Sequence, residues 1–311
     1  MTEKADAQSA LDHETLAVRP MEPTAPPEPV TVFEPRGTPA PVVFDAPHSG
    51  RHYPDDFGHA AAIELLMGGE DRFVDELFAD APSHGATYVV ANFARTYIDP
   101  NRRMSDIDVM LLDGDWHEPP EPTIMSERGV GLVFRLIGDG AAIYDRKLSA
   151  ADIINRIENY WRPYHECLRA MIDRTVGRYG ICYHVDCHSM QAVGNDLAPD
   201  PGKQRADAVL GDLNGTSCEA GFTRLVVDTL QGLGYSVAIN DPYKGALIVE
   251  RYGEPEKGIH SLQIELNRKL YMDAVTLEKT DGFLKLRDDM ASLAAAVADY
   301  ANSITSPAAG R

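Results

Sequence analysis

The chain has 311 residues, 44% of them hydrophobic, which is enough to bury the core of one α/β domain or, less readily, of two. Its formal net charge of -19 argues against a general nucleic-acid or membrane-surface binder, because either class needs a basic face to meet phosphates. No stretch approaches the roughly 20 apolar residues that cross a bilayer, and the N-terminus is acidic where a signal peptide is basic and then apolar. We therefore expect a soluble cytoplasmic protein with no nucleic-acid or membrane partner.

The first part of the chain differs in composition from the rest. Residues 1–38 are rich in Pro, Glu, Ala and Thr and contain too few apolar residues for a packed element, so they are predicted to form a flexible N-terminal arm. Residues 39–305 are predicted to form a single α/β domain.

Strand-like and helix-like segments then alternate. VVFDAP (42–47) reads as a buried strand, EDRFVDELFADAPSHG (70–85) as a helix and TYVVANFART (87–96) as a second strand. Residues 148–179 form a long amphipathic helical pattern, with Ser149 as its N-cap and a kink at Pro163.

The second half repeats this alternation. ICYHVDCHSM (181–190) reads as a strand with a polar end, 222–234 as a helix, 235–240 and 258–268 as strands, and 280–304 as a closing helix. This order predicts a doubly wound sheet with helices on both faces, in which ligands gather at the carboxyl ends of the strands. The irregular stretches 104–131 and 192–216 are long for loops and are candidates to shape a site.

The cysteines give no sign of a disulfide framework. There is no CxxC pair, and we expect reduced, mostly buried thiols at four positions: Cys167, Cys182, Cys187 and Cys218. Cys187 lies between Asp186 and His188, and strand alternation should point it away from them, into the core.

Two histidines end two of the predicted strands. His48 and His188, with a carboxylate from the 70–75 segment, would make a metal site of two imidazoles and one acid that leaves a position open for water. An Asp precedes each histidine, Asp45 and Asp186, and could orient its ring. The alternative is a purely structural role, in which each histidine ends its strand and is hydrogen-bonded within the protein.

Further polar residues fall at the same predicted edge. Glu265 could move a proton between water and a leaving amine, or it could simply pair with Arg268.

The segment FARTYIDPNRR carries Arg95, Arg102 and Arg103, which suit a substrate carboxylate unless they pair with Asp99 or Asp106. Lys244 is a further cationic candidate, and no phosphate-binding glycine loop is present.

Five motifs in the same order resemble the N-formylglutamate amidohydrolase family: PHSGRHYP, DRFVDELF, ARTYIDPNR, YHVDCHSM and LQIELNRKLYMD, from about residue 40 to 275. The resemblance implies a three-layer α/β/α sandwich with a mixed, mostly parallel sheet, like that of the zinc exopeptidases. It also implies one zinc ion, or another divalent metal, held by His48, His188 and Asp71, with Glu70 as the alternative acid.

The same resemblance implies the remaining roles. Glu265 falls where the general base is kept, and Asn101 with Arg102 falls where a substrate carboxylate is held. Arg95 would stabilise the oxyanion and Lys244 would assist in binding. The implied reaction is hydrolysis of N-formyl-L-glutamate, or of a similar small anionic N-acyl amino acid, to formate and glutamate, the closing step of one route of histidine degradation.

Two other hypotheses stay open at this point. One is a metallocarboxypeptidase or amidase that acts on a peptide. The other is a metal-free protein that binds dicarboxylates through Arg95, Arg102 and Lys244. The oligomeric state is also open, and a homo-oligomer is compatible with the sequence.

Overall fold

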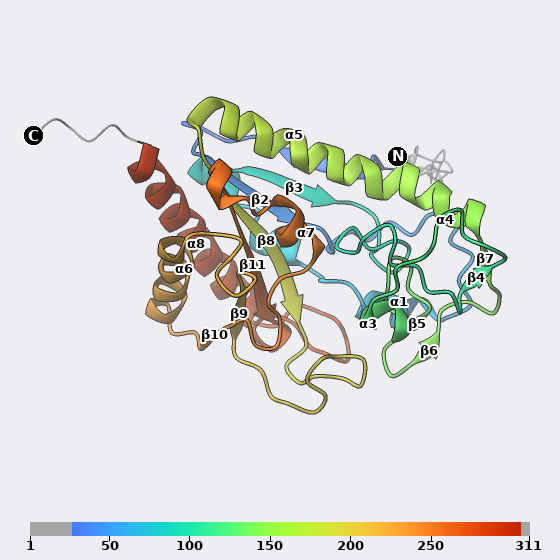
Figure 1. Cartoon of the computed structure of the whole chain (residues 1–311). Helices are drawn as coiled ribbons and strands as arrows, with labels where there is room; N and C mark the ends of the chain where they lie inside the picture. The colour runs from blue at the N-terminus through green and yellow to red at the C-terminus, as the bar shows by residue number, and fades with distance from the viewer. Residues whose placement is uncertain (1–26, 306–311) are drawn as a thin grey trace, which may run out of the picture.

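The computed structural model describes residues 27–305, and its centre is a seven-stranded sheet in the order β1-β3-β2-β8-β11-β9-β10 (Figure 1). The strands are β1 (Val30–Phe33), β2 (Val42–Ala46), β3 (Thr87–Ala91), β8 (Cys182–Met190), β9 (Ala208–Gly211), β10 (Val237–Ile239) and β11 (Ile259–Asn267). Short two-residue strands make two small ladders outside this sheet: β4 (Leu112–Asp113) with β7 (Leu148–Ser149), and β5 (Leu136–Ile137) with β6 (Ala141–Ala142).

The sheet is mixed and mostly parallel. β2 is parallel to β3 and to β8, β8 is parallel to β11, and β9 is parallel to β10. β1 joins β3, and β9 joins β11, in antiparallel fashion. The predicted mixed, mostly parallel sheet is confirmed, and its parallel core brings the carboxyl ends of β2, β8 and β11 together.

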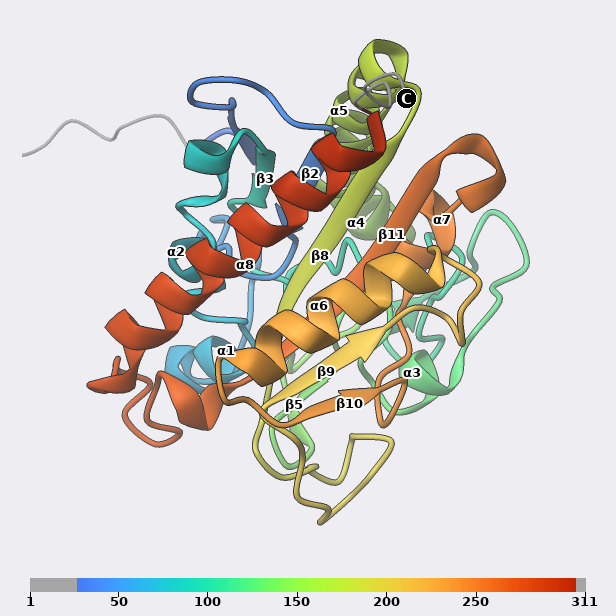
Figure 2. The same cartoon turned by 90° about the vertical axis from the view of Figure 1, so that its left-hand side faces the viewer.

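Helices cover both faces of the sheet. They are α1 (Ile63–Gly68), α2 (Val74–Leu77), α3 (Ile124–Glu127), α4 (Ala150–Arg156), α5 (Arg162–Tyr179), α6 (Ala220–Gly232), α7 (Leu247–Tyr252) and α8 (Gly282–Thr305). Figure 2 shows α6 and α8 in front of the sheet and α5 behind it. The apolar residues of α2, α6 and α8 share one core with the sheet, and those of α4, α5 and α7 share the other. The three-layer prediction is therefore confirmed.

Strand alternation separates apolar from polar side chains. On β8, Tyr183, Val185 and Cys187 pack into the α6/α8 core, as predicted for Cys187. His184 and Asp186 are equally buried but lie on the other face, where His184 bonds Asp45 of β2 and Asp186 lies beside His188. This face carries the polar groups described below.

The predicted N-terminal arm is partly wrong. Residues 30–33 form β1 and pair with β3, so the domain begins before residue 39. Residues 1–26 of the arm lie outside the described residues.

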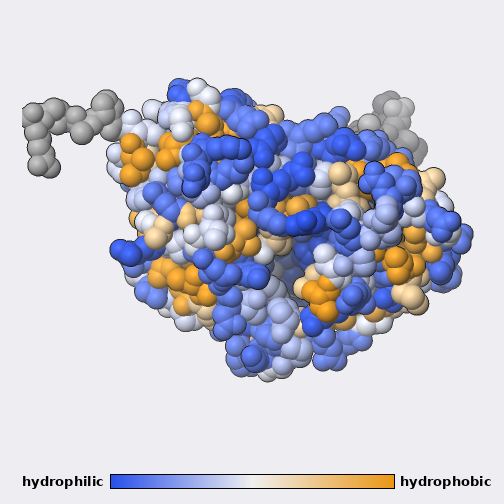
Figure 3. Space-filling model, in the orientation of Figure 1, coloured by the Kyte–Doolittle hydropathy of each residue, from blue (hydrophilic) through white to orange (hydrophobic). Residues whose placement is uncertain are grey.

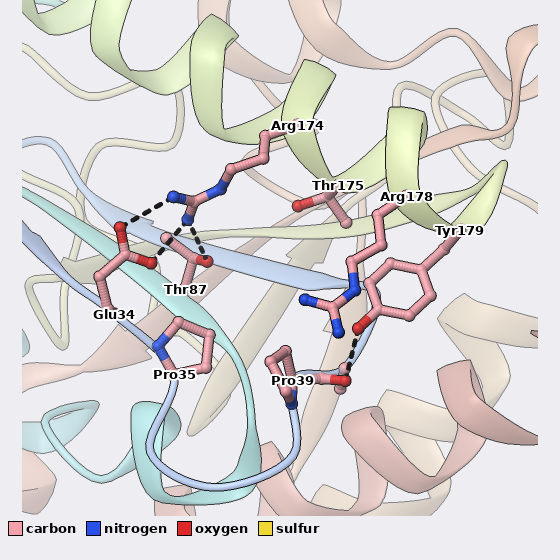
Figure 4. A pocket seen from close by; sticks show the side chains of 9 residues that line it. Glu34, Pro35, Pro39, Thr87, Arg174, Thr175, Arg178 and Tyr179 are labelled. Atoms are coloured by element: carbon pink, nitrogen blue, oxygen red, sulfur yellow. Dashed lines mark hydrogen bonds and ion pairs between the residues drawn. The ribbon is translucent and has the colours of Figure 1, made fainter.

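The chain between β1 and β2 is attached to α5. Figure 4 shows a small cavity of about 180 Å³ there, in which Arg174 donates to both carboxylate oxygens of Glu34 at 2.8 and 2.7 Å. The Tyr179 hydroxyl donates to the Pro39 carbonyl at 2.6 Å. This cavity lies at the start of β3, where Thr87 accepts from Arg174 at 3.2 Å, so it is at the opposite end of the strands from the polar cluster.

The long predicted helix at 148–179 is interrupted. Ser149 caps α4 as predicted, in a reciprocal capping box with Asp152. The irregularity is a π-helical segment, Ile157–Trp161, which precedes Pro163 in the first turn of α5. The helix predicted at 70–85 is shorter than expected: it consists of α2 and a 3-10 turn, Ala81–His84.

No helix among residues 27–305 is long and apolar enough to cross a membrane.

Candidate active site

Three buried side chains converge at the carboxyl ends of β2 and β8. His48 follows β2, His188 lies near the end of β8, and Asp71 lies between α1 and α2. The Asp71 Oδ2 atom is 3.0 Å from His188 Nδ1 and 3.4 Å from His48 Nδ1. One ligand atom from each residue lies within 4.8 Å of the others, so the structure brings the three predicted metal ligands together.

The other ring nitrogens contact carboxylates. His48 Nε2 is 2.7 Å from Asp99 Oδ1, and His188 Nε2 is 2.8 Å from Asp186 Oδ1. Because an ionised carboxylate only accepts hydrogen bonds, His48 Nε2, which is hydrogen-bonded to Asp99, carries the hydrogen, and in the neutral ring His48 Nδ1 keeps its lone pair. The Nδ1 atoms of both rings face Asp71 Oδ2, and that of His188 lies at hydrogen-bond distance from it.

This donor set fits a metal ion. His48 Nδ1 is buried and has no hydrogen-bond partner within residues 27–305. The His48 Nδ1 lone pair faces a carboxylate oxygen, and the two repel one another unless a cation or proton lies between them. Two imidazoles and one carboxylate are a common ligand set for zinc, and the outward Nε2–H group of His48 is oriented by an acid, as is usual at such sites.

Asp99, rather than Asp45, orients His48, so the predicted Asp45–His48 pair is wrong. Asp45 instead accepts hydrogen bonds from Tyr164 and from His184 Nε2, the latter at 2.9 Å. The prediction failed because Asp45 lies on the sheet face, whereas His48 has already left the strand. The predicted pairing of Asp186 with His188 is confirmed.

Glu70 points away from the cluster. It accepts from Tyr53 and from Arg72 Nη1, the latter at 2.7 Å. Asp71 is held by Arg268, whose Nη2 donates to Asp71 Oδ1 at 2.9 Å. Arg268 therefore pairs with Asp71 and not with Glu265, which removes the salt-bridge alternative for Glu265.

Glu265 lies beside the cluster. Its Cα is paired in register with that of His188 across β8 and β11, and its side chain is 9% exposed. Gln263 Nε2 donates to Glu265 Oε1 at 3.0 Å. Burial, which disfavours the charged form, raises the pKa of Glu265 to about 7. A carboxyl group with this pKa can both accept and donate a proton near neutral pH.

The three arginines of the 93–103 segment have separate surroundings. Arg95 Nη2 pairs with Asp99 Oδ2 at 2.7 Å, and Arg103 pairs with Glu250. Arg102 donates to the carbonyls of Val130 and Asn101, at 3.3 and 3.0 Å. In the part of the chain that the structure describes, no carboxylate lies within ion-pair distance of Arg102, so its charge is available to an anion.

Asn101 is buried between the cluster and α7. Its Oδ1 accepts from the Ile248 amide at 2.8 Å, which turns its Nδ2 toward His188 Nε2 at 3.3 Å. One Asn101 amide hydrogen is thereby donated to His188 Nε2. Asn101 lines the cavity above the cluster, and its second amide hydrogen remains available to an acceptor in it.

A cavity of about 1020 Å³ lies over the cluster. Its polar lining includes His48, His188, Glu265, Arg102 and Lys244, so the predicted catalytic and binding residues share one space. Lys244 is exposed and makes no ion pair with another residue among those described. Figure 3 shows a hollow near the middle of this face of the molecule, with apolar side chains at its edges.

Sequence reasoning missed several residues of this cavity: Gln263, Arg205 and Tyr243. Arg205 pairs with Asp200 at 3.0 Å through Nε and packs against the Tyr243 ring at 5.0 Å, which holds together two segments of the wall. Alternation along β11 could have identified Gln263, which precedes Glu265 by two positions and shares its face. No local pattern marks Arg205 or Tyr243.

Comparison with known proteins agrees with this geometry. The model of the N-formylglutamate amidohydrolase family matches residues 40–272. The chain is 30% identical over 259 residues to an N-formylglutamate deformylase of Pseudomonas putida, covering 81% of this chain and 86% of that one. A deformylase of the same name from Pseudomonas aeruginosa is 26% identical over 238 residues, 75% of this chain and 82% of its own.

Solved structures give the same result. The crystal structure of N-formylglutamate amidohydrolase from Ralstonia eutropha JMP134 superposes with a TM-score of 0.86 at 41% identity, covering 89% of this chain and 99% of that one. The gene product Atu2144 of Agrobacterium tumefaciens shares the fold, with a TM-score of 0.64 at 16% identity. This chain is therefore an enzyme, a hydrolase that belongs to the N-formylglutamate amidohydrolase family.

Proposed function

We propose that the protein hydrolyses N-formyl-L-glutamate to formate and L-glutamate, with a metal ion held by His48, Asp71 and His188. The buried, unpartnered Nδ1 atom of His48, facing Asp71 and next to His188, carries the metal part of this proposal. The names of the Pseudomonas and Ralstonia relatives support the substrate.

The metal would be zinc, given two imidazoles and one carboxylate as ligands. When bound, zinc supplies a Lewis acid that polarises the formyl oxygen and lowers the pKa of a water molecule toward roughly 7.

Glu265 moves the proton. As a carboxylate it accepts a proton from the attacking water, and it then donates that proton to the departing nitrogen of glutamate. Its pKa of about 7, raised by burial, suits both steps near neutral pH. The hydrogen bond from Gln263 holds one carboxylate oxygen in place and leaves the other free.

The cations of the cavity bind and orient the substrate. Arg102 and Lys244 have no carboxylate partner among the described residues and would each meet one carboxylate of the substrate. Asn101 would donate its amide hydrogens to the same substrate. Arg95, close to Asp99 and Asp71, would stabilise the oxyanion that forms at the formyl carbon. Such positioning can contribute several kcal/mol to catalysis, up to about 7–11.

Formate release from N-formyl-L-glutamate tests this proposal. It should be measured on the protein as purified, after chelation and after zinc is restored. We expect activity that is lost with chelator and returns with zinc. If the zinc-loaded protein releases no formate, this substrate is wrong.

The variant His48→Ala separates the enzyme from a metal-free binding protein. If the protein is the proposed enzyme, the variant loses metal and turnover. If it merely binds dicarboxylates through Arg102 and Lys244, the variant keeps the affinity of the wild type for glutamate and neither protein releases formate. Competition by peptides with a free C-terminus would favour the peptidase hypothesis, for which the large cavity leaves room.

A further inference from the structure

One side of the cavity is apolar, and N-formyl-L-glutamate has no apolar group that would contact this side. The side chains of Leu65 and Met67 in α1, Ile137 in β5, and Val275 in the turn after β11 line this side, which we call the apolar annex. Leu65 is 44% exposed and Val275 is 91% exposed. In Figures 1 and 2, α1 lies beside the segment that follows β11, although the two are far apart in the sequence.

The annex is joined to the metal cluster on the Asp71 side. Arg268 donates through Nη1 to the carbonyl of Gly68, the last residue of α1, at 2.9 Å, and through Nη2 to Asp71 at 2.9 Å. Ile137 lies against the next residue, because a Cβ built on Gly69 would be 2.8 Å from its Cδ1 atom. The annex therefore begins next to the cluster.

The free cations lie on another side of the cluster. Arg102 follows Asn101, which contacts His188 Nε2 and the first turn of α7, and Lys244 precedes that helix. Suppose that the substrate carboxylates meet Arg102 and Lys244 and that the acyl carbon lies at the cluster. The acyl group is then directed toward Asp71 and the annex.

The exposure of Val275 is built into the fold. Asp273 Oδ1 accepts from the amides of Val275 and Thr276 at 2.9 and 2.8 Å, and the Asp273 amide donates to the Glu278 carbonyl at 2.9 Å. These bonds fix the turn that holds the apolar Val275 side chain at the edge of the cavity.

The cavity is also large for the proposed substrate. Its volume of about 1020 Å³ slightly exceeds the range of roughly 300–1,000 Å³ that is typical of sites for drug-sized ligands. A formyl group presents only a hydrogen atom beyond its carbonyl, so it would leave the annex empty.

We propose that the enzyme also hydrolyses N-acyl-L-glutamates whose acyl group is an aliphatic chain of up to about six carbons, with this chain lying against the annex. The inference rests on the proposed function and uses the same chemistry. Water adds to the acyl carbon, the bond from carbon to nitrogen breaks, the nitrogen takes up a proton, and the products are a carboxylic acid and glutamate.

The test is glutamate release from N-formyl-, N-acetyl-, N-butyryl- and N-hexanoyl-L-glutamate by the zinc-loaded protein. The last three have similar intrinsic reactivity, so differences among them report binding of the chain. We expect kcat/KM to rise from acetyl to hexanoyl, by up to about fourfold for each buried CH₂ group. A kcat/KM that falls along this series overturns the inference.

Two variants locate the effect. Leu65→Gln and Val275→Ser should lower the ratio of kcat/KM for the hexanoyl substrate to that for the formyl substrate by about tenfold, which corresponds to 1.4 kcal/mol. Leu284→Ser is the matched control, because Leu284 is 60% exposed on α8 and outside the cavity. If this ratio is unchanged in both annex variants, the inference is overturned. The same holds if both variants lose activity equally on all substrates, as expected for a lid that closes over the site.

The two proposals fail in different ways. If formyl hydrolysis is present without a preference for longer chains, only this inference is wrong. If none of the four substrates is hydrolysed, the proposed function itself is wrong.

Discussion

At the scale of single residues, each histidine of the cluster is oriented by its own buried acid. Asp99 accepts a hydrogen bond from His48 Nε2, and Asp186 Oδ1 lies 2.8 Å from His188 Nε2. At His48 this arrangement selects the tautomer that keeps the Nδ1 lone pair directed at Asp71.

Asp99→Asn should lower metal affinity by about 10–100-fold, because an amide orients and polarises the imidazole less than a carboxylate does. The measurement is competition with a chelator of known affinity. Asp45→Asn is the control, since Asp45 contacts His184 and Tyr164 rather than a cluster histidine. If the Asp45 variant lost affinity and the Asp99 variant kept it, our assignment would be reversed.

Glu265→Gln should lower kcat for formate release by about 10²–10⁴-fold, because the amide cannot take up the proton of the attacking water. Its metal content should equal that of the wild type, since Glu265 is not a member of the cluster. Full turnover in this variant would rule out Glu265 as the base.

At the scale of elements, a buried arginine at the end of α4 attaches the long helical segment 150–179 to the segment 93–103. Arg156, at the end of α4, is 1% exposed and donates to the Tyr97 carbonyl at 2.9 Å, the Tyr144 hydroxyl at 2.7 Å and the Phe57 carbonyl at 3.3 Å. Its guanidinium lies 4.1 Å from the centre of the Tyr97 ring. The π-helical segment follows Arg156 directly.

Arg156→Met should lower the free energy of unfolding by about 2–4 kcal/mol, because buried acceptors lose their donor at roughly 1–3 kcal/mol each. Denaturant unfolding measures the change. Arg162→Met is the matched control: the Arg162 side chain is 43% exposed and pairs with Glu158 on the surface, so its loss should cost under about 1 kcal/mol. Equal effects of the two variants would contradict this account.

Periodicity located the elements that are long or strongly patterned. The strands β8 and β11 and the helices α6 and α8 fall where the sequence predicts them. β1 was missed because its neighbours are prolines and acids, and β9 because its four residues lie inside a stretch without clear alternation. Both strands exist because a neighbouring strand offers them backbone partners, which is a tertiary effect.

At the scale of the whole molecule, His165 connects α5 with α7 and with the segment 93–103 that carries Asn101. From α5, its Nε2 lies 2.8 Å from the Pro100 carbonyl, next to Asn101, and its Nδ1 lies 2.8 Å from the Tyr252 hydroxyl of α7. The carbonyl requires a hydrogen on Nε2, and the Tyr252 hydroxyl also donates to the His165 carbonyl at 3.0 Å. Burial lowers the pKa of His165 from 6.5 to about 4.

This pKa makes folding depend on pH. Between pH 6.5 and 4 the unfolded chain binds a proton at His165 that the folded protein does not, so the free energy of unfolding falls as pH falls, by up to about 3 kcal/mol from this residue. In His165→Gln that contribution is absent. We expect the stability difference between wild type and variant to shrink as pH decreases from 7 to 4.5, under the same metal conditions. A difference independent of pH would show that His165 does not cause the effect.

The sequence by itself determined the elements that carry the chemistry, because a strand's apolar alternation and polar end are local properties. It placed His48, His188 and Glu265 at one edge of a sheet and supplied the five motifs of the family. Only the tertiary structure decided which acid meets which base: Asp71 rather than Glu70, Asp99 rather than Asp45, and Arg268 with Asp71 rather than Glu265. The physical reason is that a side chain of a few ångströms finds its partner by position and direction in the packed fold, and these depend on segments that are distant along the chain.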